Sequence, residues 1–157
     1  MNIVKKYSHL NGEEYLIVHQ PELYSEIKKI ISEIGAELFR TKISKEKRKM
    51  DNSLFSPIEL NKIFKEKFYS AEWRESRYNY YITLDRELME KSIPMDSKEQ
   101  KDFLIKNGEN SPIYSYNQTD FVKNKIAVEV QFGKYSFVAY DLFVKHMLFY
   151  SGGKINL

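Results

Sequence analysis

The sequence has no cysteine among its 157 residues, and this absence excludes several kinds of chemistry. Disulfides, thiolate zinc sites and cysteine nucleophiles are all ruled out, and a chain without them fits the cytoplasm as its location. No apolar run approaches the roughly 18 residues that a transmembrane helix requires. The N-terminal stretch "MNIVKKYSHLNGEEY" also lacks the apolar core of a signal peptide.

The excess of positive over negative charge is small as well. The net charge of +3 is too small to establish a nucleic-acid partner by itself, so the distribution of charge matters more than its sum. The chain shows neither a glycine-rich phosphate loop nor a Ser-His-Asp set. Hydrophobic residues make up 42% and aromatic residues 15%, which is enough for a folded core. The length suits one domain over residues 1–157.

Apolar spacing and capping residues predict the secondary structure. Pro21 and the Ser56-Pro57 pair are typical of helix starts, and Ser97 with Gln100 indicates another. "NGEE" is ambiguous, since Asn-Gly is a hairpin signal, but Asn11 followed by Glu14 favours a capped helix. The predicted helices cover 12–19, 57–68 and 136–150, with one more opening at Pro21 and another opening at Ser97 and ending near Gly108. The predicted strands cover 2–9, 79–85, 119–122 and 126–132, with a further strand beginning at 154–157.

One strand pattern, "NQTDFVKNKIAVEVQF" at 117–132, carries polar residues that a buried strand would not need. Because side chains alternate across a strand, Glu129 and Gln131 would share a face opposite the apolar residues. A hairpin of 119–122 with 126–132 would bring Asp120 to that face. Two carboxylates at one edge repel each other, and Mg²⁺ relieves such repulsion with oxygen ligands. An ordinary solvent-facing strand gives the same pattern, so D-x8-E-x-Q alone leaves both interpretations open.

The sequence around this pattern indicates a protein family more specifically than the pattern does. D-x8-E-x-Q on a hairpin resembles the PD-(D/E)XK nuclease core, with Gln131 where a lysine usually stands. The segment "SYNQTDFVKNKIAVEVQFGKYSFVAYDLFVKHM" is similar to type II restriction endonucleases of the BglII and BstYI group. "YSHLNGEEY", "RTKISKEK", "ESRYNYYIT" and "EQKDF" resemble the same group in the same order. The likeness extends over nearly the whole chain.

The resemblance implies an α/β, restriction-endonuclease-like core, a central mixed β-sheet flanked by helices. It implies a homodimeric, Mg²⁺-dependent enzyme that cuts duplex DNA at RGATCY after the first purine, paired with a cognate DNA methyltransferase. Asp120 and Glu129 would bind the metal, together with the backbone carbonyl of Val130. A neutral glutamine is no general base, so Gln131 would position a water that the metal activates. Glu75 is a further catalytic candidate, since related enzymes place a polar residue on a helix beside the site.

DNA contacts are expected from two basic segments. In the resembled family the junction after the catalytic strand faces the major groove, where Lys134 could donate to guanine O6 and N7, with Ser136 nearby. The alternative is a phosphate contact by the same lysine. The segment "RTKISKEKRK" at 40–49 reads as a loop that neutralises phosphates, with Arg40 and Lys42 nearest the fold, or as a solvated loop.

The helix predicted at 136–150 would use Phe137, Tyr140, Val144 and Met147 as a core or dimer surface. His19 and His146 are expected to be structural. The chain ends at "SGGKINL", where a strand would only be starting, so we expect a C-terminally truncated nuclease domain. The alternative to an active enzyme is therefore a catalytically inactive DNA-binding remnant.

Overall fold

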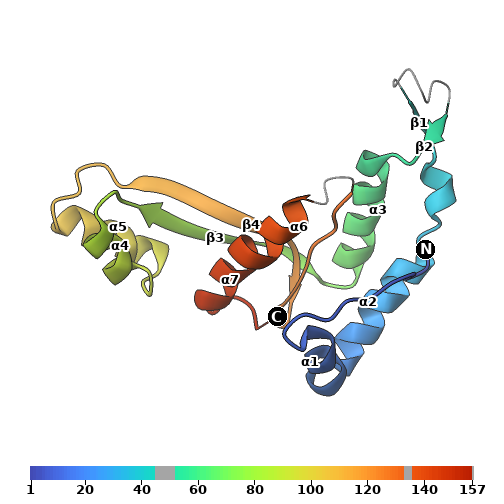
Figure 1. Ribbon diagram of the computed structural model, residues 1–157, viewed down its shortest axis with the longest axis horizontal. Helices are drawn as coiled ribbons and strands as arrows, with labels where there is room; N and C mark the ends of the chain where they lie inside the picture. The colour runs from blue at the N-terminus through green and yellow to red at the C-terminus, as the bar shows by residue number, and fades with distance from the viewer. Residues whose placement is uncertain (45–51, 133–135, 157) are drawn as a thin grey trace. The chain divides into compact units, whose positions relative to one another are not determined.

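The computed structural model describes residues 1–44, 52–132 and 136–156, and all structural statements below concern these ranges. The chain forms two compact units, Met1–Glu72 and Trp73–Leu157. Each contains helices and antiparallel strand pairs (Figure 1). The predicted α/β class, with helices flanking a sheet, is confirmed. Within those ranges no helix is long and apolar enough to cross a membrane.

The first unit is built mainly from helices. Its elements are α1 (Gly12–His19), α2 (Pro21–Glu33), the short 3-10 helix η1 (Ala36–Phe39), β1 (Lys42–Ile43), β2 (Ser53–Leu54) and α3 (Pro57–Ser70). β1 and β2 pair antiparallel, so part of the basic segment expected to be a loop is a short strand. The buried side chains recur at helical spacing on α2 and α3 and beside them: Leu23, Ile30, Ile34, Leu60, Phe64 and Phe68. Their helical spacing gives each of the two helices one apolar, buried face.

Helix starts in this unit follow the predicted residues with one exception. Pro21 opens α2, and the Ser56 hydroxyl accepts a hydrogen bond from the Glu59 N–H at the start of α3. Asn11 does not cap α1 with its side chain, because it adopts a left-handed conformation with φ of 59°. The Ser8 hydroxyl takes that role and accepts the Glu13 N–H at 3.2 Å. The helix was predicted correctly, but its capping residue was not.

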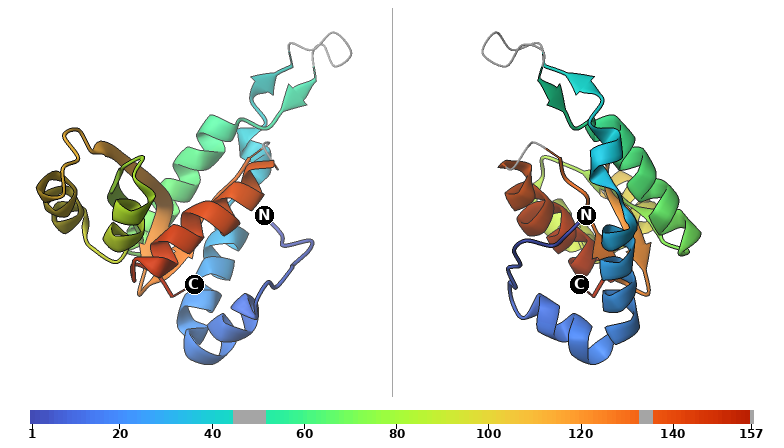
Figure 2. Two further views of the ribbon diagram at one scale, coloured as in Figure 1. Left: turned by 60° about the vertical axis from the view of Figure 1, so that its left-hand side comes forward. Right: turned by 90° about the vertical axis from the view of Figure 1, so that its right-hand side faces the viewer.

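The second unit carries the main sheet. Its elements are β3 (Arg74–Ile82), α4 (Arg86–Ser92), α5 (Ser97–Lys106), β4 (Ile113–Lys123), β5 (Ile126–Val128), α6 (Ser136–Tyr140), the π-helical segment η3 (Asp141–His146) and α7 (Met147–Ser151). The described strands run antiparallel in the order β3-β4-β5, so they form an antiparallel sheet and not the expected mixed one. β3 and β4 form a long ribbon with α4 and α5 at one end (Figure 1). The continuous helix from α6 to α7 lies alongside β4 (Figure 2).

Packing inside this unit depends on a buried amide and a glycine. The Gln100 side chain accepts the Tyr81 N–H at 2.9 Å and donates to the Ser92 carbonyl at 3.0 Å, which ties α5 to β3 and α4. At the end of α7, a Cβ on Gly152 would lie 2.1 Å from the Tyr78 ring. Glycine is therefore required for this close approach.

Several predicted strand limits were wrong. β3 begins at Arg74 instead of 79, and β5 ends at Val128 instead of 132. Residues 2–9 and 154–156 form no strand and have no strand partner in the described chain. Ile155 is nevertheless buried, and the Asn156 N–H donates to the Lys125 carbonyl at 2.7 Å. Ile155 is therefore buried without strand pairing, which needs a neighbouring strand, whereas Val4 in the other predicted strand is 94% exposed.

Candidate functional site

The site begins with the β4–β5 hairpin, which forms as the sequence predicts. Its register pairs Lys123 with Ile126 and Phe121 with Val128. Asn124 and Lys125 turn the chain with φ of 49° and 64°, as a tight two-residue hairpin turn requires. Extending this register by one residue sets Asp120 opposite Glu129.

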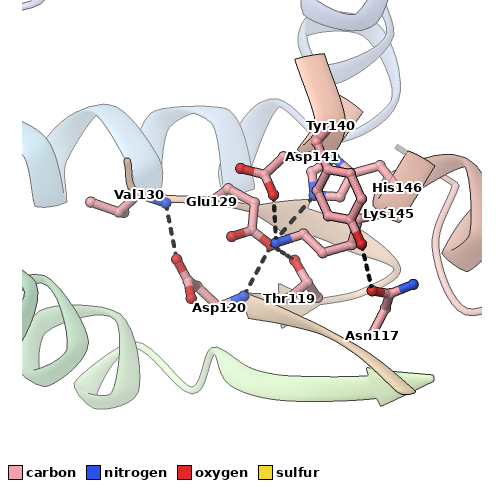
Figure 3. Close-up of polar contacts among 9 residues, drawn as sticks. All are labelled: Asn117, Thr119, Asp120, Glu129, Val130, Tyr140, Asp141, Lys145 and His146. Carbon is pink, nitrogen blue, oxygen red and sulfur yellow. Dashed lines mark hydrogen bonds and ion pairs between the residues drawn. The ribbon is translucent and has the colours of Figure 1, made fainter. Parts of the chain in front are cut away.

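Asp120 and Glu129 are joined by hydrogen bonds across the end of the hairpin (Figure 3). The Asp120 N–H donates to Glu129 Oε1 at 3.2 Å, and the Val130 N–H donates to Asp120 Oδ2 at 3.1 Å. The Thr119 hydroxyl, completely buried, also donates to Glu129 Oε1. β4 and the segment after β5 therefore hold both carboxylates in defined orientations.

The helical segment η3 adds a positive charge to this pair. Lys145 Nζ lies 2.8 Å from Glu129 Oε1 and 3.0 Å from Asp141 Oδ1, and the Lys145 side chain is buried. His146 Nε2 lies 3.6 Å from the same Glu129 oxygen, which is longer than a hydrogen bond. Figure 3 shows these side chains directed from the helix toward Glu129. Two strand carboxylates and one helix ammonium thus form a single cluster.

The two carboxylates have opposite pKa shifts. Burial, and next the charge of Glu129, raise the pKa of Asp120 to about 6. Burial also favours the neutral form of Glu129, but the contacts with His146, Lys145 and Thr119 outweigh it and lower that pKa to about 2. Burial lowers the pKa of Lys145, yet the hydrogen bonds to Glu129 and Asp141 leave it raised. At neutral pH Glu129 is an anion and Lys145 a cation.

The donor set fits a hard divalent cation. Mg²⁺ is commonly held by one or two carboxylates, with waters and substrate phosphates completing its shell. Asp120 and Glu129 supply two such groups, near enough that the charge of Glu129 raises the pKa of Asp120. No group of three or more His, Asp or Glu side chains suited to a metal occurs in the described ranges. A site with two carboxylates would therefore rely on other oxygen donors.

Gln131 and Glu75 lie differently from their predicted positions. Gln131 is exposed and lies beyond the end of β5, so strand alternation does not set it beside Glu129. Glu75 lies on strand β3 and not on a helix. It falls in the register shift between Arg74 and Ser76, which face Val122 and Thr119. This irregularity, a β-bulge, places the backbone of Glu75 opposite the part of β4 that contains Asp120.

The predicted DNA-binding residues belong to separate parts of the chain. Lys134 lies outside the described residues, and Ser136 is the first residue of α6. Arg40 belongs to the first unit, where its Nε lies 3.0 Å from Glu37 and its guanidinium 4.6 Å from the Phe55 ring. Lys42 is exposed at the start of β1. Their roles toward DNA remain predictions.

The helix over 136–151 buries a different face from the expected one. Phe137, Tyr140, Val144 and Met147 are between 45% and 51% exposed, so their prediction as core is wrong. The buried residues are Lys145 and Phe149, one turn apart. Tyr140 still contributes a contact, because its hydroxyl donates to Asn117 Oδ1 at 3.2 Å. The apolar side of this helix thus faces outward, and its charged side faces the cluster.

Lys145 is the residue that sequence reasoning missed. Asp141 and Lys145 are four residues apart, a spacing at which opposite charges meet on a helix. Both stand within a strongly apolar segment, where a paired charge is unusual enough to notice. π-helical turns are also frequent at functional sites, but nothing in the sequence indicated one here. His19, by contrast, packs at the end of α1 against Tyr15, with the ring centroids 4.7 Å apart and the rings tilted by 40°.

Comparison with known proteins finds a family for the chain. Residues 4–157 match the family model described as restriction endonuclease BglII/BglIII. No curated protein shows significant similarity to the chain. The α/β architecture around the β4–β5 hairpin fits the PD-(D/E)XK-like core of restriction endonucleases. Since the match covers almost the entire sequence, the chain belongs to the BglII/BglIII family of restriction endonucleases, which are DNA-cleaving hydrolases.

Proposed function

We propose that the protein is a Mg²⁺-dependent type II restriction endonuclease of the BstYI kind. Its target would be the palindrome RGATCY, cut in both strands after the first purine to leave GATC overhangs. The observation that carries the proposal is the convergence of Asp120 and Glu129 at the end of the β4–β5 hairpin. The D-x8-E-x-Q spacing and the similarity to the BstYI group support the finer assignment.

Asp120, Glu129 and the backbone carbonyl of Val130 would hold the metal. Bound there, Mg²⁺ would supply a Lewis acid that neutralises charge on the scissile phosphodiester. The protein's own groups do the positioning: the Val130 N–H orients Asp120, and the Asp120 N–H and Thr119 hydroxyl orient Glu129. Gln131 cannot accept a proton as a base, so its proposed role is to orient the attacking water by hydrogen bonding.

Cleavage of both strands of a palindrome requires two copies of the site, which a C2 homodimer supplies. The outward apolar face of the 136–151 helix supports such an association. Its exposed residues include Phe137, Tyr140, Phe143, Val144 and Met147. Contiguous exposed apolar residues of this kind mark interaction surfaces. A cognate methyltransferase would protect the host's own sites, as in a restriction-modification system.

DNA contacts would come from the two basic segments. Lys134 would donate to guanine O6 and N7 in the major groove, with Ser136 beside it. Arg40 and Lys42 would contact phosphates, and such contacts make affinity fall steeply with salt. Lys42, being exposed, needs no rearrangement, whereas Arg40 would first leave its ion pair with Glu37.

Plasmid digestion tests the function directly. In Mg²⁺ the wild-type protein should yield discrete fragments with GATC ends. Glu129→Ala should abolish cleavage because it removes a metal ligand, yet it should still shift duplex DNA in Ca²⁺. Glu87→Ala is the matched control, since Glu87 lies in the same unit on α4 with its side chain 85% exposed. Full cleavage by Glu129→Ala would refute Glu129 as a metal ligand. If the wild type shifts DNA but does not cut it, the inactive DNA-binding remnant would be favoured.

A further inference from the structure

Lys145 brings a positive charge to a site whose sequence pattern lacks one. The nuclease pattern that this chain resembles has a lysine two residues after the glutamate, and here that position is the neutral Gln131. Gln131 is exposed, whereas the Lys145 ammonium lies 2.8 Å from Glu129. The cation at the carboxylates therefore comes from helix η3, 16 residues after Glu129.

The contacts of Lys145 fix one oxygen of Glu129. The Thr119 hydroxyl, the Asp120 N–H and the Lys145 ammonium all reach Oε1. None of these three contacts uses Oε2, so the carboxylate is held in one orientation by one oxygen. The other oxygen is the one that it can present to a ligand. Groups that hold a metal ligand in this way commonly affect the reaction without touching the substrate.

Asp141 holds the ammonium from its other side. Its Oδ1 lies 3.0 Å from Lys145 Nζ, and the side chains of Asp141 and Glu129 are each 15% exposed. A buried charge is costly unless it is paired, and Lys145 is paired twice. The two ion pairs therefore fix the ammonium between Asp141 and Glu129.

We propose that Lys145 is a positioning residue for DNA cleavage: it holds Glu129 through Oε1 and supplies the positive charge that Gln131 cannot. Asp141 anchors this lysine to its own helix. The inference rests on the proposed function and deepens it, because it names a residue that serves the same phosphodiester hydrolysis. The competing interpretation is that the ammonium only takes the place of the metal and leaves when the metal binds.

Three variants of the full chain separate these interpretations. Lys145→Met keeps the length of the side chain and removes its charge, Lys145→Arg keeps the charge, and Asp141→Asn removes only the anchor. Lys106→Met is the matched control, because Lys106 is exposed in the last turn of α5. For each protein we would measure the single-turnover cleavage rate across Mg²⁺ concentrations, DNA affinity in Ca²⁺, and the melting temperature.

A positioning role predicts a split between rate and binding. Lys145→Met should cut about 100-fold more slowly at saturating Mg²⁺ and bind DNA in Ca²⁺ within about 3-fold of wild type. Lys145→Arg should recover the rate to within about 10-fold, since it restores the charge. Asp141→Asn should be about 10-fold slower. Lys106→Met should match the wild type. A purely structural role would alter the melting temperature without this split.

Other outcomes overturn the inference. If Lys145→Met cuts at the wild-type rate, or at lower Mg²⁺ than the wild type, the ammonium is only a substitute for the metal. If Lys145→Arg is as slow as Lys145→Met while both bind DNA, the charge is not what matters. If Lys145→Met does not fold, the test is made with Asp141→Asn. A wild-type cleavage rate in Asp141→Asn would then refute the positioning role of Lys145. A wild type that cuts no DNA would instead refute the proposed function itself.

Discussion

Two ion pairs in this protein have the same length and very different surroundings. Lys145 and Glu129, in the second unit, are 2.8 Å apart with side chains 11% and 15% exposed. Lys67 and Glu33, in the first unit, are also 2.8 Å apart, but their side chains are 38% and 40% exposed. Water screens the exposed Lys67–Glu33 pair and competes for its hydrogen bonds, whereas the buried Lys145–Glu129 pair has little access to water. The comparison teaches that distance alone does not distinguish a buried ion pair from an exposed one.

Replacing Lys145 and Lys67 by methionine, one at a time, should give the largest difference in stability between the two pairs. Lys145→Met leaves Glu129 and Asp141 without their common partner, so the free energy of unfolding should fall by about 3 kcal/mol and Tm by about 10 °C. Lys67→Met should shift Tm by no more than about 1 °C, because exposed pairs contribute little. Thermal unfolding followed by circular dichroism measures both. Equal shifts would show that burial does not distinguish the pairs.

Two threonines allow the same comparison of a buried with an exposed site, with smaller expected losses of stability. Thr119 and Thr41 each donate a hydroxyl hydrogen bond to a glutamate, Glu129 and Glu59 respectively. Thr119 is completely buried, and Thr41 is exposed. Thr119→Val removes a buried hydrogen bond to a charged acceptor and should cost about 1–2 kcal/mol.

The matched variant Thr41→Val should leave the unfolding midpoint in urea unchanged, because water replaces the lost partner of Glu59. Chemical denaturation of both variants provides the measurement. A loss at Thr41 as large as that at Thr119 would contradict the proposed dependence on burial.

Added salt should produce the smallest change in the Tm differences between the variants and the wild type. Raising the ionic strength from about 0.01 M to about 1 M shortens the Debye length from about 30 Å to about 3 Å and screens exposed charges. The small Tm difference between wild type and Lys67→Met should then vanish, while the difference for Lys145→Met should persist. Melting both variants and the wild type at the two salt concentrations tests this. A Lys145→Met difference that disappears in salt would mean that the cluster is open to solvent.

Local patterns predicted much of this protein. The helices after Pro21, at 57–70 and over 136–151 follow from apolar spacing and helix-start residues, which act within a few residues of each other. The helix at 12–19 was also predicted, although its cap was not. Helix α4 was missed although Asp85 caps it, with its carboxylate accepting the Leu88 N–H. It has only seven residues, too few for apolar periodicity to show. At α5 the cap lies one residue earlier than predicted, since Asp96 and Glu99, and not Ser97 and Gln100, form the capping box.

The sequence by itself determined the hairpin and the meeting of its two carboxylates. Asp120 and Glu129 are separated by one tight turn, so local register alone brings them together. Only the tertiary structure decided that Lys145 joins them, that Gln131 is exposed, and that the 136–151 helix turns its apolar face outward. A helix shows its apolar and polar sides in its sequence, but which side is buried depends on what packs against it. That packing joins segments distant along the chain, and here it buried the charged side.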